Sequence, residues 1–583
     1  MHRRFKRRQH QVEDLGVLTE QQFEQNFFKR LNKFTLVWRF VTAWVVLVVL
    51  ILGCLVAQNQ ALSNYYQKLG PVPGGIFSEG IMGSFTNANP LYATSDVDAT
   101  VARLVFSGLF KYDNDNKLVG DLAESWQVDD RGSTYTVKLR PNLTWQDGKP
   151  LTADDVAFTY HTIQNPDAQS PFNASWQNIV VTAIDSRTVS FKLANSLSSF
   201  IYTLTNGIVP AHILQDIPVS DLRSVSFNTA RPIGAGPFAW DAIEVTGNTP
   251  DTAEVRVALK PFDKYWNGSP KLKNYVVHSF ASQRAMENSY KRRDITAIAG
   301  LPGIPKDLRG GDSVVHDIRL NAATMVFFKT STGVLSNVKV RQALVKGIDQ
   351  TAVLKKLDYQ TRAVKEPLLQ GQVGYNPAYA QASFNKDQAK ADLAADGWVA
   401  GPAGILQKDK QKLIFDLYTD DNPEYVTISK ELAKQWRELG VVARLTVQPN
   451  SDFKNTLAYH SYDAVLHGIS IGVDPDVFVY WDSSQTDIRS ANRLNFSEYK
   501  STAADSALQA GRSRQDAALR TIKYQPFLAA WQQDAPALGL YQPRYLYITH
   551  GEVYGLEEHS INAGIDRLSN VDQWMIRTAR ITN

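Results

Sequence analysis

The feature that constrains this chain most is an apolar run near its N-terminus, Phe40 to Ala57, which carries no charged residue. At about 1.5 Å per residue, a helix of this length spans about 27 Å, close to the ~30 Å hydrocarbon thickness of a bilayer. Trp38 and Trp44 suit the interfacial belt of a membrane. The run therefore predicts a transmembrane anchor that separates a short N-terminal segment from a long C-terminal part.

The charge on either side of this run predicts its orientation. Residues 1–39 are basic, whereas positive charge is scarce just after Ala57, so residues 1–39 are expected in the cytoplasm and the C-terminal part outside. Within the basic segment, Thr19 and Gln22 suit a capping box, and the apolar residues after them share one helical face. These are Phe23, Phe27, Phe28 and Leu31. The segment is either a helix at an anionic membrane surface or a solvated basic tail.

Cys54 offers an alternative to the anchor. Ile51 to Cys54 resembles a lipoprotein processing box, after which Cys54 would carry a lipid. The basic region is longer than a usual signal region, and the apolar run continues past Cys54, so we favour the uncleaved anchor. Because Cys54 is the single cysteine, the rest of the chain can form no disulfide, thiolate zinc site or cysteine nucleophile.

Length and composition limit the possible folds of the part after the anchor. The chain has 583 residues, which is too long for one ordinary core and suits two or three subdomains. The net charge is only +4 and the basic residues gather at the N-terminus, so nucleic acid is a poor candidate partner. The glycines and prolines of Leu69 to Gly75 cannot propagate a helix and predict a spacer over residues 58–74.

The segment Leu118 to His161 has the clearest local pattern. Alternating side chains predict a strand over Thr134–Arg140, paired as a hairpin with Trp126–Val128 through the turn at Asp129–Gly132. A second turn precedes Thr152, which lies three residues before Asp155 as in a helix start. The order is strand, turn, strand, turn, helix, and it contains no catalytic pattern.

Taken whole, LVGDLAESWQVDDRGSTYTVKLRPNLTWQDGKPLTADDVAFTY resembles the signature of the family 5 solute-binding proteins, the oligopeptide, dipeptide and nickel receptors of ABC importers. The resemblance continues in order from about residue 75 to residue 555. It implies an α/β fold of the periplasmic-binding-protein type II, with two lobes closing on a cleft and an inserted subdomain. By analogy, lobe I comprises 75–117, 200–315 and 530–583, the insertion 118–199, and lobe II 316–529, all within a solute-binding domain of 75–583.

Further elements are expected from periodicity. We expect helices over Val101–Phe110 and Val338–Leu354, the second capped by Ser336, and a third that starts at Asn385 and stops at Gly397. Two strands, Leu413–Tyr418 and Ala443–Val447, bracket a helix whose apolar residues share one face, which predicts a β-α-β unit. The apolar face consists of Ile428, Leu432, Trp436 and Leu439.

Catalytic and metal patterns are weak. The sequence has no Gly-x-Ser-x-Gly elbow, His-Glu-x-x-His or phosphate loop. His460 and His467 could face one way, but ordinary hydrogen-bonded histidines are the better interpretation. Asp113 and Asp115 faintly resemble a calcium loop, yet Leu118 occupies the position that needs glycine, which favours a hairpin turn. No catalytic residue, metal or cofactor is predicted.

The expected ligand contacts come from the resemblance. Tyr462–Trp481 is similar to a family segment in which an aspartate can hold the α-amine of a peptide; here that position is Ile471 or Gly472. The resemblance implies that Asp474, Tyr480 and Trp481 lie at the cleft, although Asp474 could instead cap the next helix. Asn89 and Tyr92 belong to an early segment that lies near the cleft in the family.

The resemblance implies a membrane-tethered, extracytoplasmic receptor that delivers its ligand to an ABC permease and its ATPase subunits. It favours peptides as the ligand and a monomeric receptor. A metal chelate, a sugar or another small solute stays open as ligand, and a surface hydrolase with an unrecognised site stays open as a different function.

Overall fold

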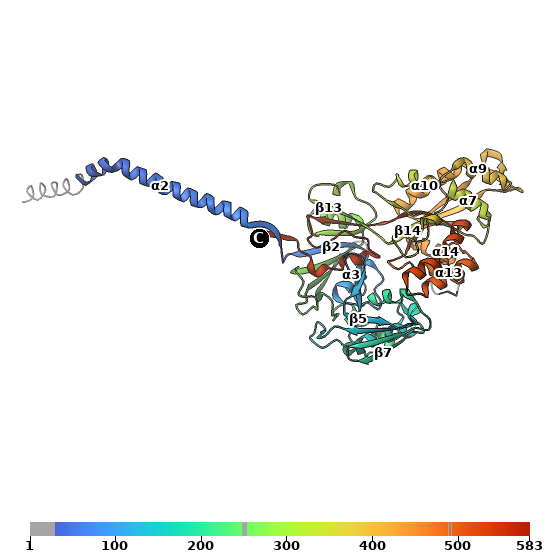
Figure 1. Ribbon diagram of the computed structural model, residues 1–583, viewed down its shortest axis with the longest axis horizontal. Helices are drawn as coiled ribbons and strands as arrows, with labels where there is room; N and C mark the ends of the chain where they lie inside the picture. The colour runs from blue at the N-terminus through green and yellow to red at the C-terminus, as the bar shows by residue number, and fades with distance from the viewer. Residues whose placement is uncertain (1–28, 248–253, 488, 491–492, 583) are drawn as a thin grey trace, which may run out of the picture. The chain divides into compact units, whose positions relative to one another are not determined.

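The computed structural model describes residues 29–247, 254–487, 489–490 and 493–582 (Figure 1). The chain divides into two compact units, Met1–Val72 with Thr578–Asn583, and Pro73–Arg577. The predicted helix start at Thr19 and the aromatic residues after it lie outside the described residues.

The first unit contains a long helix, α2 (Lys29–Tyr66), followed by strand β1 (Gln67–Val72). Within α2, Val37–Gln60 is long and apolar enough to cross a membrane, and Cys54 is exposed. The expected spacer is therefore ordered as far as Val72: residues 58–66 contain no glycine or proline, so the helix continues to Tyr66. Pro71 is accommodated because β1 pairs only with β24 (Arg577–Thr582), which leaves it an edge strand.

The second unit is built on three main sheets. The first has seven strands, and β2 runs parallel to both of its neighbours, β11 and β12. Ala297 and Ala299 face the core on one side with α3, and Ile298 faces the core on the other side with α6. In order, the strands are β13 (Ser313–Arg319), β23 (Arg544–His550), β12 (Ala297–Leu301), β2 (Ile76–Met82), β11 (Asn274–Phe280), β10 (Glu254–Pro261) and β9 (Phe238–Thr246), with helices α3 (Asp96–Val105) and α6 (Gln283–Lys291).

The second sheet has six strands and also carries a core on each face, since alternate residues of β14 enter different clusters. Its strands in order are β15 (Arg362–Ala363), β22 (Ala537–Gln542), β14 (Ala322–Phe328), β21 (Ala464–Ser470), β19 (Ile414–Asp420) and β20 (Val442–Gln448). The helices that accompany it are α7 (Val338–Lys346), α8 (Gln350–Leu354), α9 (Lys386–Ala395), α10 (Pro423–Glu438), α11 (Asn450–Tyr459), α12 (Phe478–Trp481), α13 (Thr502–Arg512) and α14 (Ala517–Asp534).

The third sheet is antiparallel, and its core is continuous with that of the seven-stranded sheet. We therefore call these two sheets together lobe I, and the six-stranded sheet with its helices lobe II. The four strands in order are β5 (Ala123–Val128), β6 (Thr134–Leu139), β8 (Thr188–Lys192) and β7 (Val180–Asp185), with helices α4 (Ala153–Gln164) and α5 (Ala211–Leu214) nearby. Smaller sheets are β3 (Phe110–Tyr112) with β4 (Leu118–Gly120), and β16 (Val399–Ala400) with β17 (Leu406–Lys408) and β18 (Gln411–Lys412).

The chain crosses between the lobes at two short segments, Leu320–Asn321 and Pro543. They lie side by side, because the backbone N–H of Leu320 donates to the carbonyl of Pro543 at 3.0 Å. Strand β22 belongs to the six-stranded sheet, so the chain returns to lobe I after Gln542, later than the expected boundary at residue 530.

Several local predictions are confirmed. The hairpin of β5 and β6 is present, and at the start of α4 the Asp155 carboxylate accepts the Thr152 backbone N–H at 2.9 Å. Strands β19 and β20 run parallel around α10, as the β-α-β prediction requires, and Ile428, Leu432 and Trp436 are buried. Asn385 caps α9, which ends just before Gly397 with its φ of 92°.

Three helix predictions are wrong in detail. Helix α3 ends at Val105, because the following residues turn into β3 rather than continue to Phe110. The segment Val338–Leu354 is two helices, since Gly347 ends α7 and Asp349 caps a new helix, α8. The cap of α7 is Asn337, whose side chain accepts the Lys339 N–H, and not Ser336.

Candidate functional site

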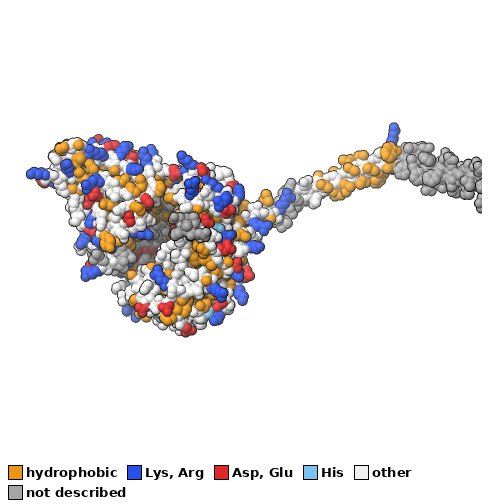
Figure 2. All heavy atoms as spheres, turned by 180° about the vertical axis from the view of Figure 1, so that it is seen from behind, with side chains coloured by type: hydrophobic (Ala, Val, Ile, Leu, Met, Phe, Trp, Pro, Cys, Tyr) orange, Lys and Arg blue, Asp and Glu red, His pale blue; other side chains and the backbone are white. Residues whose placement is uncertain are grey.

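A cavity of about 370 Å³ lies where the two lobes meet, and we call it the interlobe cavity. Its wall includes Asn321, which belongs to one crossing segment, and Gln542, which directly precedes the other. Figure 2 shows a hollow on one face of this unit, where the lobes come together. The wall consists of Asp115, Asn116, Tyr202 and Ser560 from lobe I, Arg362, Leu369 to Val373, Val473 to Pro475 and Arg520 from lobe II, and the two crossing residues.

Asp474, a predicted site residue, lines this cavity and is paired with Arg520 of α14. Two hydrogen bonds join the guanidinium to the carboxylate, at 2.6 and 2.7 Å, and both side chains are at most 7% exposed. Burial alone would lower the pKa of Arg520, but the hydrogen bonds and charge of Asp474 raise it above its usual value. Asp474 does not cap α12, whose preceding residue, Val477, makes no side-chain cap. The pair therefore presents a neutralised, rigid wall.

Neighbouring Asp476 joins the lobes. It accepts from Arg512 of lobe II at 2.9 Å and from the Ser199 hydroxyl of lobe I at 2.7 Å. Two more hydrogen bonds cross nearby, from Ser196 to the Ser513 carbonyl at 2.9 Å and from Gln515 to the Tyr135 hydroxyl at 2.9 Å. The lobes are thus in direct polar contact beside the cavity.

The other predicted site residues lie behind these surfaces. The Tyr480 hydroxyl donates to the Ser470 carbonyl at 2.7 Å, and burial raises the pKa of Tyr480 to about 12. Trp481 is fully buried in the core of lobe II, where it packs against Phe327 and Trp531. In this structure both residues support the segment that carries Asp474.

Asn89 and Tyr92 flank a second cavity of about 370 Å³, within lobe I. Asn89 is fully buried and bonds Asn228 at 3.0 Å and the Leu91 N–H at 3.0 Å, while Tyr92 is 5% exposed. They hold the turn that contributes Pro90 and Ala93 to the cavity wall. The rest of that wall includes Ala99, Ala102, Arg103 and Phe106 near α3, and Phe172, Trp176 and Thr203.

Asp474 is the one residue of this cavity wall that was predicted as a site residue. The residues missed include Asn321, Arg362 and Gln542. Arg362 and Gln542 are direct partners across strands β15 and β22, although the sequence separates them widely. Neither stands in a motif, so only the sheet pairing identifies them. The Ile471 N–H and the Gly472 N–H both donate to the Asn321 carbonyl, at 3.0 and 2.9 Å, which ties Ile471–Gly472 to a crossing segment.

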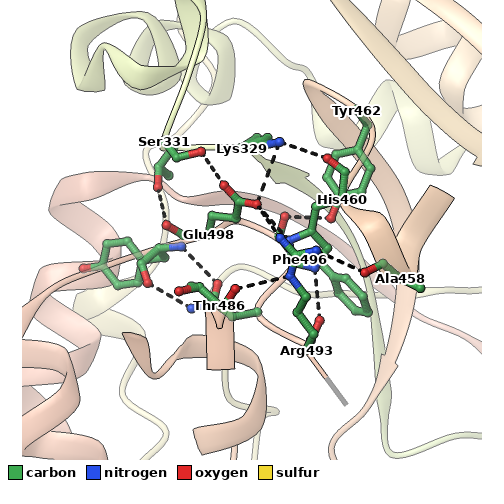
Figure 3. A network of polar contacts seen from close by, with 12 residues as sticks. Lys329, Ser331, Ala458, His460, Tyr462, Thr486, Arg493, Phe496 and Glu498 are labelled. Atoms are coloured by element: carbon green, nitrogen blue, oxygen red, sulfur yellow. Dashed lines mark hydrogen bonds and ion pairs between the residues drawn. The ribbon is translucent and has the colours of Figure 1, made fainter. Parts of the chain in front are cut away.

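His460 and His467 lie in different surroundings. His460 is fully buried, with Nδ1 3.1 Å from Glu498 and Nε2 3.0 Å from the Arg493 carbonyl (Figure 3). Glu498 also faces Arg493 at 3.3 Å, Lys329 at 3.8 Å and the Ser331 hydroxyl, and its pKa is lowered to about 2, chiefly by the His460 hydrogen bond. His460 is therefore an ordinary hydrogen-bonded histidine, as expected.

The hydrogen-bond network around His460 holds three residues in an unfavourable backbone conformation. His460, Arg493 and Glu498 all have left-handed backbone, with φ of 51°, 44° and 46°. Such conformations cost free energy for residues other than glycine and persist when side-chain bonds hold them. His467 is half-buried, and desolvation of its ring lowers its pKa to about 4. Its Nδ1 has no hydrogen-bond partner among the described residues, so the expectation of a hydrogen-bonded histidine is not met there. Among the described residues, no group of three or more His, Cys, Asp or Glu side chains is placed to hold a metal ion.

The predicted hairpin turn at Asp113 is confirmed. Its carboxylate accepts the backbone N–H groups of Asp115 and Lys117 at 2.9 and 2.8 Å, between β3 and β4. Asp115 in turn lies 3.3 Å from the Lys117 ammonium, and both side chains are largely exposed.

The chain matches a known protein family and several known relatives. The model of the bacterial extracellular solute-binding proteins, family 5, matches residues 117–490. The oligopeptide-binding protein AppA of Bacillus subtilis is 25% identical over 91% of this chain and 97% of its own length. The probable D,D-dipeptide-binding periplasmic protein DdpA of Escherichia coli is 24% identical over 85% of this chain and 93% of its own length.

Solved structures have the same fold. AppA of Bacillus subtilis in complex with a nonapeptide superposes with a TM-score of 0.70 at 25% identity, covering 87% of this chain and 100% of that one. NikZ of Campylobacter jejuni, in complex with Ni(L-His), gives a TM-score of 0.72 at 24% identity, over 86% of this chain and 99% of that one.

Proposed function

Because the chain belongs to family 5 of the bacterial extracellular solute-binding proteins, we propose that it is the substrate-binding component of an ABC importer and that its ligand is a peptide. The observation that carries the proposal is the interlobe cavity, whose wall combines both lobes with Asn321 and Gln542. A ligand there stabilises the closed arrangement by its extra contacts in that state. AppA, which matches along nearly the whole chain, is named for oligopeptide binding.

The membrane part of the proposal concerns Val37–Gln60. We infer that this segment is an uncleaved anchor, with the basic residues before it in the cytoplasm and the solute-binding domain on the extracytoplasmic face. The tether would confine a monomeric receptor near its permease and the attached ATPase subunits, which raises their effective concentration. A lipid on Cys54 is the competing arrangement, and the mass of the mature N-terminal peptide distinguishes the two.

Native mass spectrometry of the full chain, purified in detergent micelles, tests the ligand. We expect co-purified peptides that are released on unfolding and rebind saturably to the refolded or ligand-exchanged protein. Recovery of the peptides intact after long incubation supports a receptor, whereas cleavage products would support the hydrolase. If peptide pools neither co-purify nor bind, the peptide assignment is wrong.

A further inference from the structure

The charges of the interlobe cavity are unequally compensated. Four charged side chains line it: Asp115, Arg362, Asp474 and Arg520. Asp474 and Arg520 neutralise each other, and Asp115 is close to Lys117. Among the described residues, none supplies a carboxylate that pairs with Arg362. Arg362 is therefore the charged side chain of the wall that has no ion-pair partner among the described residues.

A second arginine, outside the cavity wall, adds positive charge near Arg362. Burial and the neighbouring charge of Arg362 lower the pKa of Arg319, the last residue of β13. An anionic group bound at Arg362 would offset this like-charge repulsion.

Gln542 supplies the complementary observation. Only 5% of its surface is exposed, and its Oε1 is buried with no hydrogen-bond partner among the described residues. The amide nitrogen faces the Leu320 carbonyl at 3.4 Å, which leaves the oxygen as the free end. A buried acceptor without a donor costs free energy unless a ligand supplies an N–H or O–H.

Arg362 and Gln542 are neighbours at the cavity wall. They are directly opposite each other in the antiparallel pair of β15 and β22, so their side chains are on one face of the sheet, and both line the cavity. One offers donors to an anion, and the other offers an acceptor to an adjacent donor. The C-terminal residue of a peptide has both groups on one α-carbon: the carboxylate, which accepts hydrogen bonds, and the amide nitrogen, whose N–H donates one.

The position that would hold an ammonium has no charge. Ile471 is 7% exposed and lies in the core of lobe II, and Gly472 has no side chain. The Gly472 carbonyl already accepts from the Gln372 amide at 2.7 Å. The segment that departs from the family pattern thus leaves the cavity without an obvious partner for a free α-amine.

We propose that the cavity binds its ligand through a carboxylate held by Arg362, with the adjacent N–H donated to Oε1 of Gln542, and that the group bound is the C-terminal residue of a peptide. This inference rests on the proposed function for the word peptide, but the carboxylate recognition stands on the cavity itself. It gives the ligand the opposite polarity from recognition by a free N-terminus.

The test uses the full chain in detergent and a tetrapeptide pool randomised at every position. The pool is made in three forms: free at both ends, N-acetylated with a free carboxylate, and C-terminally amidated with a free amine. Apparent affinities are measured by titration under native mass spectrometry. We expect the free and N-acetylated forms to bind within about threefold of each other and the amide form at least ~10-fold more weakly.

Variants of the two residues sharpen the result. In Arg362→Gln the free form should fall to the level of the amide form, while binding of the amide form stays unchanged. Gln542→Glu places a carboxylate beside Arg362 with little change in shape, so it should compete with the ligand and give a similar loss. The matched control is Arg284→Gln, an exposed arginine of α6 away from the cavity, which should bind as the parent does.

The outcomes separate the two proposals. Equal binding of the amide and free forms, or undiminished binding by Arg362→Gln, overturns carboxylate recognition and leaves the peptide receptor intact. A second probe is an N-carboxyalkyl amino acid, which has a carboxylate and an N–H group on one carbon but is not a peptide. If no peptide form binds, but this probe binds the parent and does not bind Arg362→Gln, carboxylate recognition stands and the peptide assignment falls. If none of these probes binds, both fall.

Discussion

Three buried carboxylates differ in how many hydrogen bonds they accept: Glu79 in the core of lobe I, Asp474 at the cavity wall, and Glu366 in lobe II outside that wall. Glu79, in β2, meets Arg567 through two hydrogen bonds of 2.9 and 2.7 Å and also accepts the Tyr275 hydroxyl at 2.9 Å. Asp474 has a comparable arginine pair, but one side of it faces a cavity. Glu366 has only the Asn376 N–H at 3.3 Å, and its Oε1 has no partner among the described residues.

The difference indicates what each region is for. The Glu79–Arg567 pair is at most 1% exposed and locks the core of lobe I, where the charge of Glu79 raises the pKa of Arg567 well above its usual value although burial opposes it. At the cavity wall, Oε1 of Gln542 has no hydrogen-bond partner among the described residues. A wall that receives a ligand can leave such a group for the ligand to satisfy.

The largest expected effect is that of Glu79→Gln. It leaves the Arg567 guanidinium buried without a counter-charge, so we expect a loss of about 3–5 kcal/mol in the free energy of unfolding. Urea denaturation of the full chain measures it. A loss below ~1 kcal/mol would contradict the view that this pair holds the core together.

The next effect concerns the pH dependence of stability. Burial raises the pKa of Glu366 to about 7 although the Asn376 N–H opposes it, so the folded state favours the protonated form. This contribution is fully present below the unfolded pKa of about 4.5 and is lost as the pH rises from there through the folded pKa of about 7, with a fall of ~3 kcal/mol expected between pH 4.5 and 8. Glu366→Gln should remove this part of the pH profile; an unchanged profile would show that Glu366 is solvated or paired.

A smaller loss is expected for Asp474→Asn. The asparagine keeps one hydrogen bond to Arg520, and water in the cavity can solvate the arginine, so we expect about 1–2 kcal/mol. Denaturation run in parallel with Glu79→Gln makes the comparison directly. If the two substitutions cost the same, the cavity side of the Asp474 pair is as closed as the core of lobe I.

The smallest effect is that of Arg362→Gln without ligand. Since Arg362 is exposed and pairs with no carboxylate of the described residues, stability should change by less than ~0.5 kcal/mol. Thermal unfolding of the ligand-free protein measures it. A large destabilisation would mean that Arg362 holds the structure rather than a ligand.

The sequence predicted local structure well and the cavity poorly, for a physical reason. Turn chemistry and helix capping act over a few residues, which is why the hairpin before Thr152 and the β-α-β unit around α10 were predictable. Asp474 was predicted because it belongs to a continuous motif. The pairing of Arg362 with Gln542 is a long-range contact that no local pattern encodes.

Predicted helix boundaries were wrong where two residues that can start or end a helix lie close together in the sequence. Ser336 and Asn337 are both good caps, and the backbone selects the asparagine. Gly347 interrupts what periodicity alone presents as one helix. The return to lobe I was placed near residue 530, but β22 continues the six-stranded sheet to Gln542, and strand order is set by tertiary pairing.

The two crossing segments differ in stiffness, and this bears on how the lobes can turn. The ring of Pro543 fixes its φ, so this crossing segment is the stiffer of the two. Changes in backbone dihedral angles during lobe rotation are therefore expected at Leu320 and Asn321. The Asn321 carbonyl is the acceptor for both Ile471 and Gly472. A backbone rotation at Asn321 therefore also moves Ile471 and Gly472, which directly precede Val473 and Asp474 of the cavity wall. Rotation of the lobes and movement of this part of the wall are thus coupled.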